Sequence, residues 1–142
     1  MIYTTNTKKA LNLCFKAHKE QYDKSALPYV FHPFHLAEQM VDEPTTIVAL
    51  LHDVIEDTDY TLEDLREMGF DENVIEAISI LTHDIKTSYM EYIANIKLNP
   101  IAKVVKLADL KHNSDLSRLD IVTPKDKERV NKYMKAIELL NL

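Results

Sequence analysis

Residues 46–59 of the chain read TIVALLHDVIEDTD, an apolar run that passes directly into a cluster of acidic side chains. The apolar spacing predicts a buried helix, and Asp53, Glu56 and Asp57 follow at its end. The C-terminal end of a helix carries partial negative charge, so carboxylates gathered there raise the energy unless a cation offsets them. A metal ion beside His52 and Asp53 would be such a cation. A solvated acidic turn is the alternative interpretation.

Two further segments contain side chains of the same kind. His32 stands just before Pro33 at an expected helix start, and Asp109 follows another apolar helical run. Alone, a histidine beside a proline is most often a cap or a surface residue, and a lone aspartate in a helix is usually solvated. With His52 and Asp53, however, they make two imidazoles and two carboxylates, which suit manganese, iron or magnesium better than a thiolate-rich zinc site does. We therefore predict one metal site formed by these four residues.

The composition predicts a globular and mostly helical chain. Its 142 residues are 46% hydrophobic and 28% charged, with one glycine and five prolines. This length suits one domain, so we expect a single domain over residues 1–142. An all-β fold would leave its turns unexplained, because hairpins draw on glycine wherever a turn needs a positive φ. The lone Cys14 rules out a disulfide framework within the chain, reads as a small buried hydrophobe, and favours a cytoplasmic location.

Charge and hydropathy limit the possible partners. The formal net charge of −6 disfavours binding to a nucleic-acid polymer, which depends on clustered basic residues. A small phosphorylated ligand needs only a local basic pocket, for which the candidates are Lys24, Lys103, Lys106, Lys111 and Arg129. No apolar run reaches the roughly 18 residues of a membrane span, and no signal-peptide pattern is present, so we expect no membrane association. The pattern does not distinguish a monomer from a homo-oligomer.

We expect about eight helices, packed as one all-α bundle without a sheet. The apolar spacing predicts a first helix over residues 5–21 and then a loop over 22–31. Proline is tolerated in the first turn of a helix, which predicts starts at Pro33, Pro44, Pro100 and Pro124. Further apolar faces predict helices over 74–81, 89–96 and 100–113.

Local capping signals support two of these helix starts. Thr61 with Asp64, and Thr123 with Asp126, resemble capping boxes in which Asp replaces the usual Glu. The first pair predicts a helix that begins near residue 62, and Gly69 should close that helix.

The order of His32, His52–Asp53 and Asp109 resembles that of the HD phosphohydrolase superfamily. Longer strings are similar to the hydrolase domain of the RelA/SpoT homologues and run from about residue 10 to 133. They are AHKEQ (17–21), Lys24, PY (28–29), HP (32–33), ALLHDVIEDT (49–58), KLAD (106–109) and Asn113. HDxxEDT combined with the upstream HP and the downstream LADxxxN is specific to that subgroup. The resemblance implies an all-α, HD-type helical domain without a synthetase or regulatory domain.

The resemblance also implies an activity, the hydrolysis of the 3′-pyrophosphate of guanosine tetra- or pentaphosphate to GDP or GTP and pyrophosphate. The cofactor would be a divalent metal, Mn²⁺ foremost with Fe²⁺ or Mg²⁺ as alternatives, which lowers the pKa of bound water. Glu56 and Asp57 match the family's catalytic pair. The positions that match its nucleotide contacts are Lys24, Asn113, Arg129 and Tyr133. By spacing alone, however, Arg129 is equally a surface charge and Tyr133 equally a core aromatic.

The chain departs from the family pattern in one loop and in one later segment. Asp23 stands where the family usually has an arginine that packs on the guanine base, and a carboxylate cannot form that cation–π contact. The glycine usual near Ser25–Ala26 is absent, and residues 81–84 also differ. Another nucleotide, such as a nucleoside monophosphate or NADPH, is therefore an alternative substrate. A sensor that binds a nucleotide without cutting it is an alternative of a different class.

Four histidines lie outside the predicted ligand set. His18 and His112 fall in family-like strings and are expected to be structural or to support the ligands. His35 and His83 are expected on helix surfaces or at helix ends.

Overall fold

The computed structural model describes all residues from 1 to 142, and it contains helices but no strand. In chain order the helices are α1 (Thr5–His18), α2 (Phe31–Glu38), α3 (Glu43–Leu51), α4 (Val54–Asp57), α5 (Leu62–Glu67), α6 (Glu72–Leu81), α7 (Tyr89–Lys97), α8 (Pro100–Asn113), the 3₁₀ helix η1 (Leu116–Arg118) and α9 (Pro124–Leu140). Because α4 is a single turn, this confirms the expected all-α bundle of about eight helices. None of the helices combines the length and the hydropathy needed to cross a membrane.

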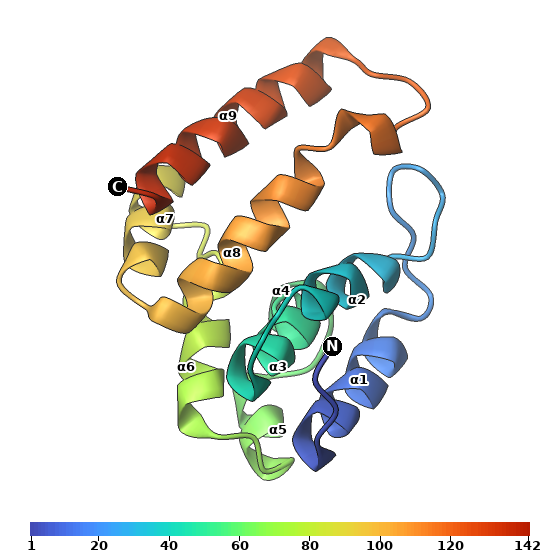
Figure 1. Cartoon of the computed structure of the whole chain (residues 1–142), viewed down its shortest axis with the longest axis vertical. Coiled ribbons are helices and arrows are strands. Elements are labelled where there is room, and N and C mark those ends of the chain that lie inside the picture. Colours follow the sequence, from blue (N-terminus) through green and yellow to red (C-terminus); the bar gives the residue numbers. More distant parts are fainter.

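Helix α3 lies at the centre of the bundle, in contact with α1, α2, α6 and α8 (Figure 1). Seven of its nine residues are buried, as expected of a core helix. Its start is defined by Asp42, whose side chain accepts a hydrogen bond from the Thr45 N–H, and by Pro44 in the first turn. The buried stretch of residues 46–51 thus forms the part of the core on which these four helices pack.

The local start and stop signals hold. Capping boxes are present at Thr61–Asp64 and at Thr123–Asp126, each with both reciprocal hydrogen bonds. Helices α8 and α9 begin at the predicted prolines, and Gly69 follows α5 with a φ of +87°. The first helix ends at His18 rather than near residue 21. Cys14 is fully buried, and burial raises the pKa of its thiol to about 12.

A turn at His52 and Asp53 separates the buried helix from the acidic residues that follow it. α3 ends at Leu51, and α4 begins at Val54 after a turn. The two side chains of the turn have different hydrogen-bond partners. His52 Nδ1 lies 2.7 Å from the carbonyl oxygen of Ala49, whereas the Asp53 carboxylate accepts a hydrogen bond from the hydroxyl of Tyr29.

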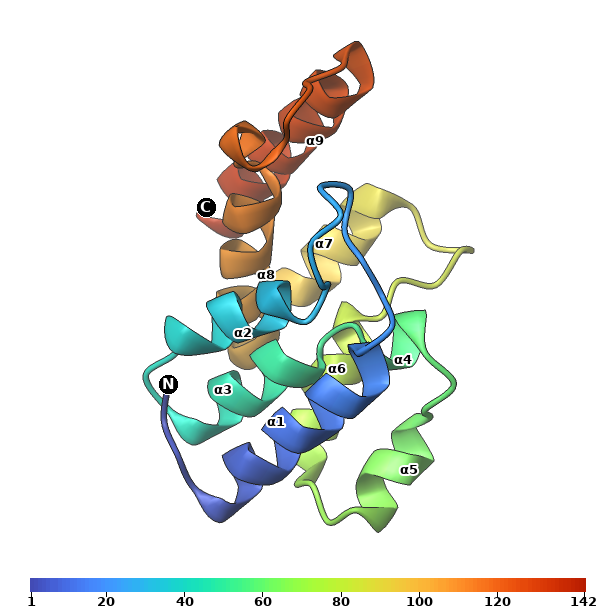
Figure 2. The ribbon, with the colours of Figure 1, turned by 90° about the vertical axis from the view of Figure 1, so that its right-hand side faces the viewer.

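The predicted loop between α1 and α2 forms a narrow projection. An isolated bridge joins Tyr22 to Pro28, and Ala26 at the tip has a φ of +61°. This is the left-handed region that glycine occupies most easily, which fits the glycine expected nearby from the family pattern. Figure 2 shows this loop rising beside the outer half of α8, and Ser25 Oγ donates a hydrogen bond to the carbonyl oxygen of Arg118 in η1 at 2.6 Å.

Candidate metal centre and adjoining cavity

Three of the predicted ligands meet where α2, α3 and α8 pack together. His32 lies in the first turn of α2, His52 follows α3, and Asp109 lies on α8. One ligand atom of each lies within 4.8 Å of the others, and all three residues are buried. His32 Nε2 is 2.8 Å and His52 Nε2 is 3.6 Å from Asp109 Oδ1. This geometry can hold one divalent metal ion.

Asp53, the fourth predicted ligand, borders this triad. Its Oδ2 lies 3.1 Å from His52 Nε2 and also accepts the hydrogen bond from Tyr29. Burial raises the pKa of Asp53, but the adjacent His52 outweighs burial and lowers this pKa to about 2. The carboxylate is therefore ionised and directed at the nitrogen that a metal ion would contact.

The hydrogen bonding and the charge environment of the His52 ring indicate that the site suits a cation. Because its Nδ1 faces the Ala49 carbonyl, Nδ1 carries the proton and Nε2 presents a lone pair in the neutral ring. Nε2 is buried and has no hydrogen-bond partner. Burial lowers the pKa of His52, but the charges of Asp53 and Asp109 outweigh it and raise this pKa well above its ordinary value. The two carboxylates thus favour positive charge at Nε2, and a divalent ion would supply it without a proton.

The Asp109 carboxylate is held on both of its oxygens. Oδ2 lies 2.9 Å from Lys106 Nζ, and Oδ1 accepts a hydrogen bond from Asn113 Nδ2 at 3.0 Å. Burial raises the pKa of Asp109, but Lys106 and the two histidines outweigh burial and hold this pKa well below its usual range. Lys106 is nearly buried, and its spacing of three residues before Asp109 on one helix is the signal that identifies this contact.

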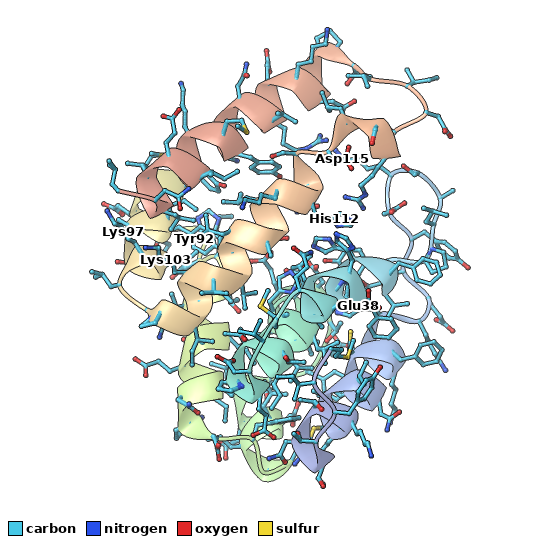
Figure 3. All side chains as sticks on the ribbon, viewed as in Figure 1. Glu38, Tyr92, Lys97, Lys103, His112 and Asp115 are labelled. Carbon is cyan, nitrogen blue, oxygen red and sulfur yellow. The ribbon has the colours of Figure 1, made fainter.

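His112 contacts His32 on the side of the ring that faces away from Asp109. His32 Nδ1 lies 2.7 Å from His112 Nδ1, and the two rings are stacked with centroids 5.0 Å apart. Burial and nearby positive charges, led by Arg118, lower the pKa of His112 to about 4, so His112 is neutral and can accept a hydrogen bond from His32. Figure 3 shows His112 between α8 and α2, where the exposed ring of His35 also packs against it.

The predicted catalytic carboxylates lie at the end of α4. Glu56 lines the cavity beside the triad, and its Oε1 accepts a hydrogen bond from the backbone N–H of His83 at 2.8 Å. Asp57 is outside the lining of that cavity. Burial, reinforced by the charges of Asp53 and Glu56, raises the pKa of Asp57 to about 6.

The cavity beside the triad has a volume of about 170 Å³ and brings in residues that motif matching did not assign. Besides His52, Asp53, Glu56 and Asp109 and the predicted nucleotide contacts Asn113 and Tyr133, its lining includes His83, Tyr89, Tyr92, Lys106 and Lys132. His83 follows the end of α6 as expected, but its ring also lines this cavity and stacks on Tyr92. A lone histidine after a helix gives no local signal of this role, because the packing of α6 against α8 creates it.

A second cavity of about 360 Å³ adjoins the first and contains all four predicted nucleotide contacts. They are Lys24, Asn113, Arg129 and Tyr133, of which Asn113 and Tyr133 line both cavities. Lys103 and Lys111, considered as parts of a basic pocket, line neither. A separate cavity of about 450 Å³ lies beyond Tyr92 and includes none of the predicted site residues.

The comparisons agree with this arrangement. No family model matches the chain. Among curated proteins, the chain is 34% identical over 117 residues to a probable GTP pyrophosphokinase of Mycobacterium leprae, which covers 74% of this chain. It is 34% identical over 125 residues to a guanosine-3′,5′-bis(diphosphate) 3′-pyrophosphohydrolase of Borreliella burgdorferi, again over 74% of the chain. A solved structure, described as a metazoan ortholog of SpoT that hydrolyzes ppGpp, superposes with a TM-score of 0.79 at 25% identity, over 99% of this chain and 87% of that one.

The chain is an HD-type domain of the RelA/SpoT kind. It spans only a small part of its curated relatives, 15% of the Mycobacterium leprae protein and 18% of the Borreliella burgdorferi protein. The resemblance drawn from the motifs and the all-helical fold of this HD-type domain are both confirmed.

Proposed function

We propose that this HD-type domain is a metal-dependent 3′-pyrophosphohydrolase of guanosine tetra- and pentaphosphate. The observation that carries the proposal is the convergence of His32, His52 and Asp109, with an unpartnered His52 Nε2, beside a cavity that also contains Glu56. Relatives that bear the name of this activity support the choice of substrate.

His32, His52, Asp53 and Asp109 would hold the ion, proposed to be Mn²⁺ because imidazoles and carboxylates together suit it. When bound, such an ion lowers the pKa of a coordinated water and neutralises charge on phosphate. In the reaction, the water oxygen forms a bond to the phosphorus that carries the 3′ oxygen. The bond between that phosphorus and the 3′ oxygen breaks. The 3′ oxygen leaves as a hydroxyl after it takes up a proton, which gives GDP or GTP and pyrophosphate.

Glu56 and Asp57 are proposed to orient the attacking water and to take up its proton. Glu56 lines the cavity, and a pKa of about 6 makes Asp57 a stronger base than an ordinary aspartate while leaving it ionised at neutral pH. Lys24, Asn113, Arg129 and Tyr133 are proposed to hold the nucleotide in the adjoining cavity. The shared lining of the two cavities would allow one ligand to extend across both.

The test measures pyrophosphate release by the purified chain with Mn²⁺, Fe²⁺ or Mg²⁺. Guanosine tetraphosphate is compared with NADPH and with nucleoside monophosphates. We expect guanosine tetraphosphate with Mn²⁺ to be the best combination, and Glu56→Gln and Asp57→Asn to slow turnover by roughly 10²–10⁴-fold with metal binding retained.

Glu63→Gln is the control, because Glu63 lies on the exposed surface of α5. Faster turnover of another nucleotide would replace the proposed substrate. Nucleotide binding without any product would favour the sensor alternative.

A further inference from the structure

Arg118 occupies a fixed position in the wall of the second cavity. It ends η1, and its side chain is held from two sides. Nη1 donates a hydrogen bond to the carbonyl oxygen of His112 at 2.9 Å, and Nη2 lies 3.6 Å from Asp23 Oδ2. The side chain nevertheless keeps 28% of its surface exposed. A guanidinium held in this way is oriented before any ligand enters.

The same contacts decide which part of Arg118 a ligand can use. A guanidinium binds a phosphate in a bidentate manner through its hydrogen-bonding edge, and here Nη1 already donates to a carbonyl oxygen while Nη2 faces the Asp23 carboxylate at 3.6 Å. Asp23 also offsets the positive charge. The flat face is therefore the part that remains for recognition, and guanidinium faces stack on aromatic rings.

The other two cations of the cavity, Lys24 and Arg129, both approach Asp126 on α9. Arg129 Nη1 is 2.9 Å and Lys24 Nζ is 4.0 Å from Asp126 Oδ1, and the Lys24 side chain is 66% exposed. Lys24 keeps a compact ammonium that is free to turn to an anion, whereas Arg118 does not. Lys24 is thus the cation better suited to turn to a phosphate, and Arg118 is the one better suited to present its face to a planar ring.

We propose that Arg118 is a specificity-determining residue of this domain, which stacks its guanidinium on the purine base of the bound nucleotide, and that Asp23 is its positioning residue. This inference rests on the proposed function for the identity of the nucleotide. Tyr22, Tyr29 and Tyr133 line the same cavity and add aromatic surface suited to a base.

Asp23 performs two tasks that can be separated experimentally. Its Oδ1 accepts hydrogen bonds from the backbone N–H groups of Ser25 and Leu27, at 2.8 and 3.1 Å, which shape the loop. Its Oδ2 faces Arg118. Asp23→Asn keeps an oxygen for the backbone bonds but removes the charge that orients the guanidinium.

The experiment measures binding of GDP and of inorganic pyrophosphate to the full chain by calorimetry at a fixed Mn²⁺ concentration. GDP contains the base and pyrophosphate does not. We expect Arg118→Ala to weaken GDP binding about tenfold and to leave pyrophosphate binding within about twofold. Arg118→Lys should not restore GDP binding, because lysine keeps the charge but has no planar face. Asp23→Asn should weaken GDP binding by a smaller factor.

Arg66→Ala is the matched control, since Arg66 pairs with Glu63 and Glu72 on the surface of α5 and α6 and lines neither cavity. Thermal unfolding of each variant verifies folding, and Arg118→Lys carries the test if Arg118→Ala is unfolded. The proposal is overturned if GDP binding is unchanged, if pyrophosphate binding falls equally, or if lysine restores GDP binding. It is also overturned if the wild-type chain does not bind GDP.

Turnover of guanosine tetraphosphate separates this inference from the proposed function. If the wild-type chain hydrolyses the substrate and the Arg118→Ala variant has the same KM as the wild type, only the inference about Arg118 is contradicted. A wild-type chain that binds GDP through Arg118 but releases no pyrophosphate contradicts the proposed function alone.

Discussion

At the scale of single residues, the contact between His32 and His112 orients a proposed metal ligand. When Nε2 of His32 gives its lone pair to a metal ion, Nδ1 carries the proton, and His112 Nδ1 at 2.7 Å is positioned to accept that hydrogen bond. Such an acceptor behind a ligand fixes its tautomer and its orientation. His112→Ala is therefore expected to weaken Mn²⁺ binding by roughly 10–100-fold, as measured by calorimetric titration.

His35→Ala is the control for this prediction, because that ring is exposed and packs on His112 without bonding to a ligand. Equal Mn²⁺ affinity in wild-type protein and His112→Ala would show that the bond between the rings contributes nothing to the site.

At the scale of elements, the start of α9 depends on Asp126. Its carboxylate accepts hydrogen bonds from the backbone N–H and the hydroxyl of Thr123 and from Arg129, and these bonds lower the pKa of Asp126 to about 2. A carboxyl whose pKa is lower in the folded chain stabilises it above the unfolded pKa near 4, and this contribution is lost as the pH falls through about 2.

The pH dependence of the Asp126→Ala variant tests this cap. The free energy of unfolding should be higher for the wild type than for the variant, and this difference should be largest above about pH 4. The difference should shrink as the pH falls toward about 2. Urea unfolding across this range measures it. A margin that does not change with pH would mean that the carboxylate charge has no part in capping α9.

At the scale of the whole molecule, the central position of α3 makes its buried side chains important for stability. Leu50 is fully buried, and α3 contacts four other helices. Leu50→Ala should therefore reduce the free energy of unfolding by about 2–5 kcal/mol in urea unfolding. Ile121→Ala removes a side chain of similar size that is 79% exposed, and it should change stability by less than about 0.5 kcal/mol. Similar losses for both would contradict the assignment of α3 to the core.

The candidate metal centre also links elements across the molecule, because His32 lies on α2, His52 follows α3 and Asp109 lies on α8. An ion that binds only the folded chain stabilises it by about 4 kcal/mol at a thousandfold excess over its Kd, so a chelator should lower the Tm by roughly 10 °C. His32→Ala should unfold at the same temperature with and without the chelator. A chelator effect of equal size in this variant would place the ion elsewhere.

The helices were predictable because their signals are local. Thr61 with Asp64, Thr123 with Asp126, and the prolines at α3, α8 and α9 act within one helical turn, so distant residues have little influence on them. The break at His52–Asp53 was not predictable in this way. At this break Asp53 accepts a hydrogen bond from Tyr29, which lies 24 positions earlier in the chain, and local signals do not indicate such a contact.

The sequence by itself determined the helical class, the ligand types and the motif spacing, since these depend on residue chemistry and short-range periodicity. Only the tertiary structure decided that His112 supports His32, that His83 and Lys106 line the cavity, and that Arg118 pairs with Asp23. The physical reason is that these relations are set by how whole helices pack. Helix packing follows from the combined burial of many apolar side chains rather than from any single pair of positions.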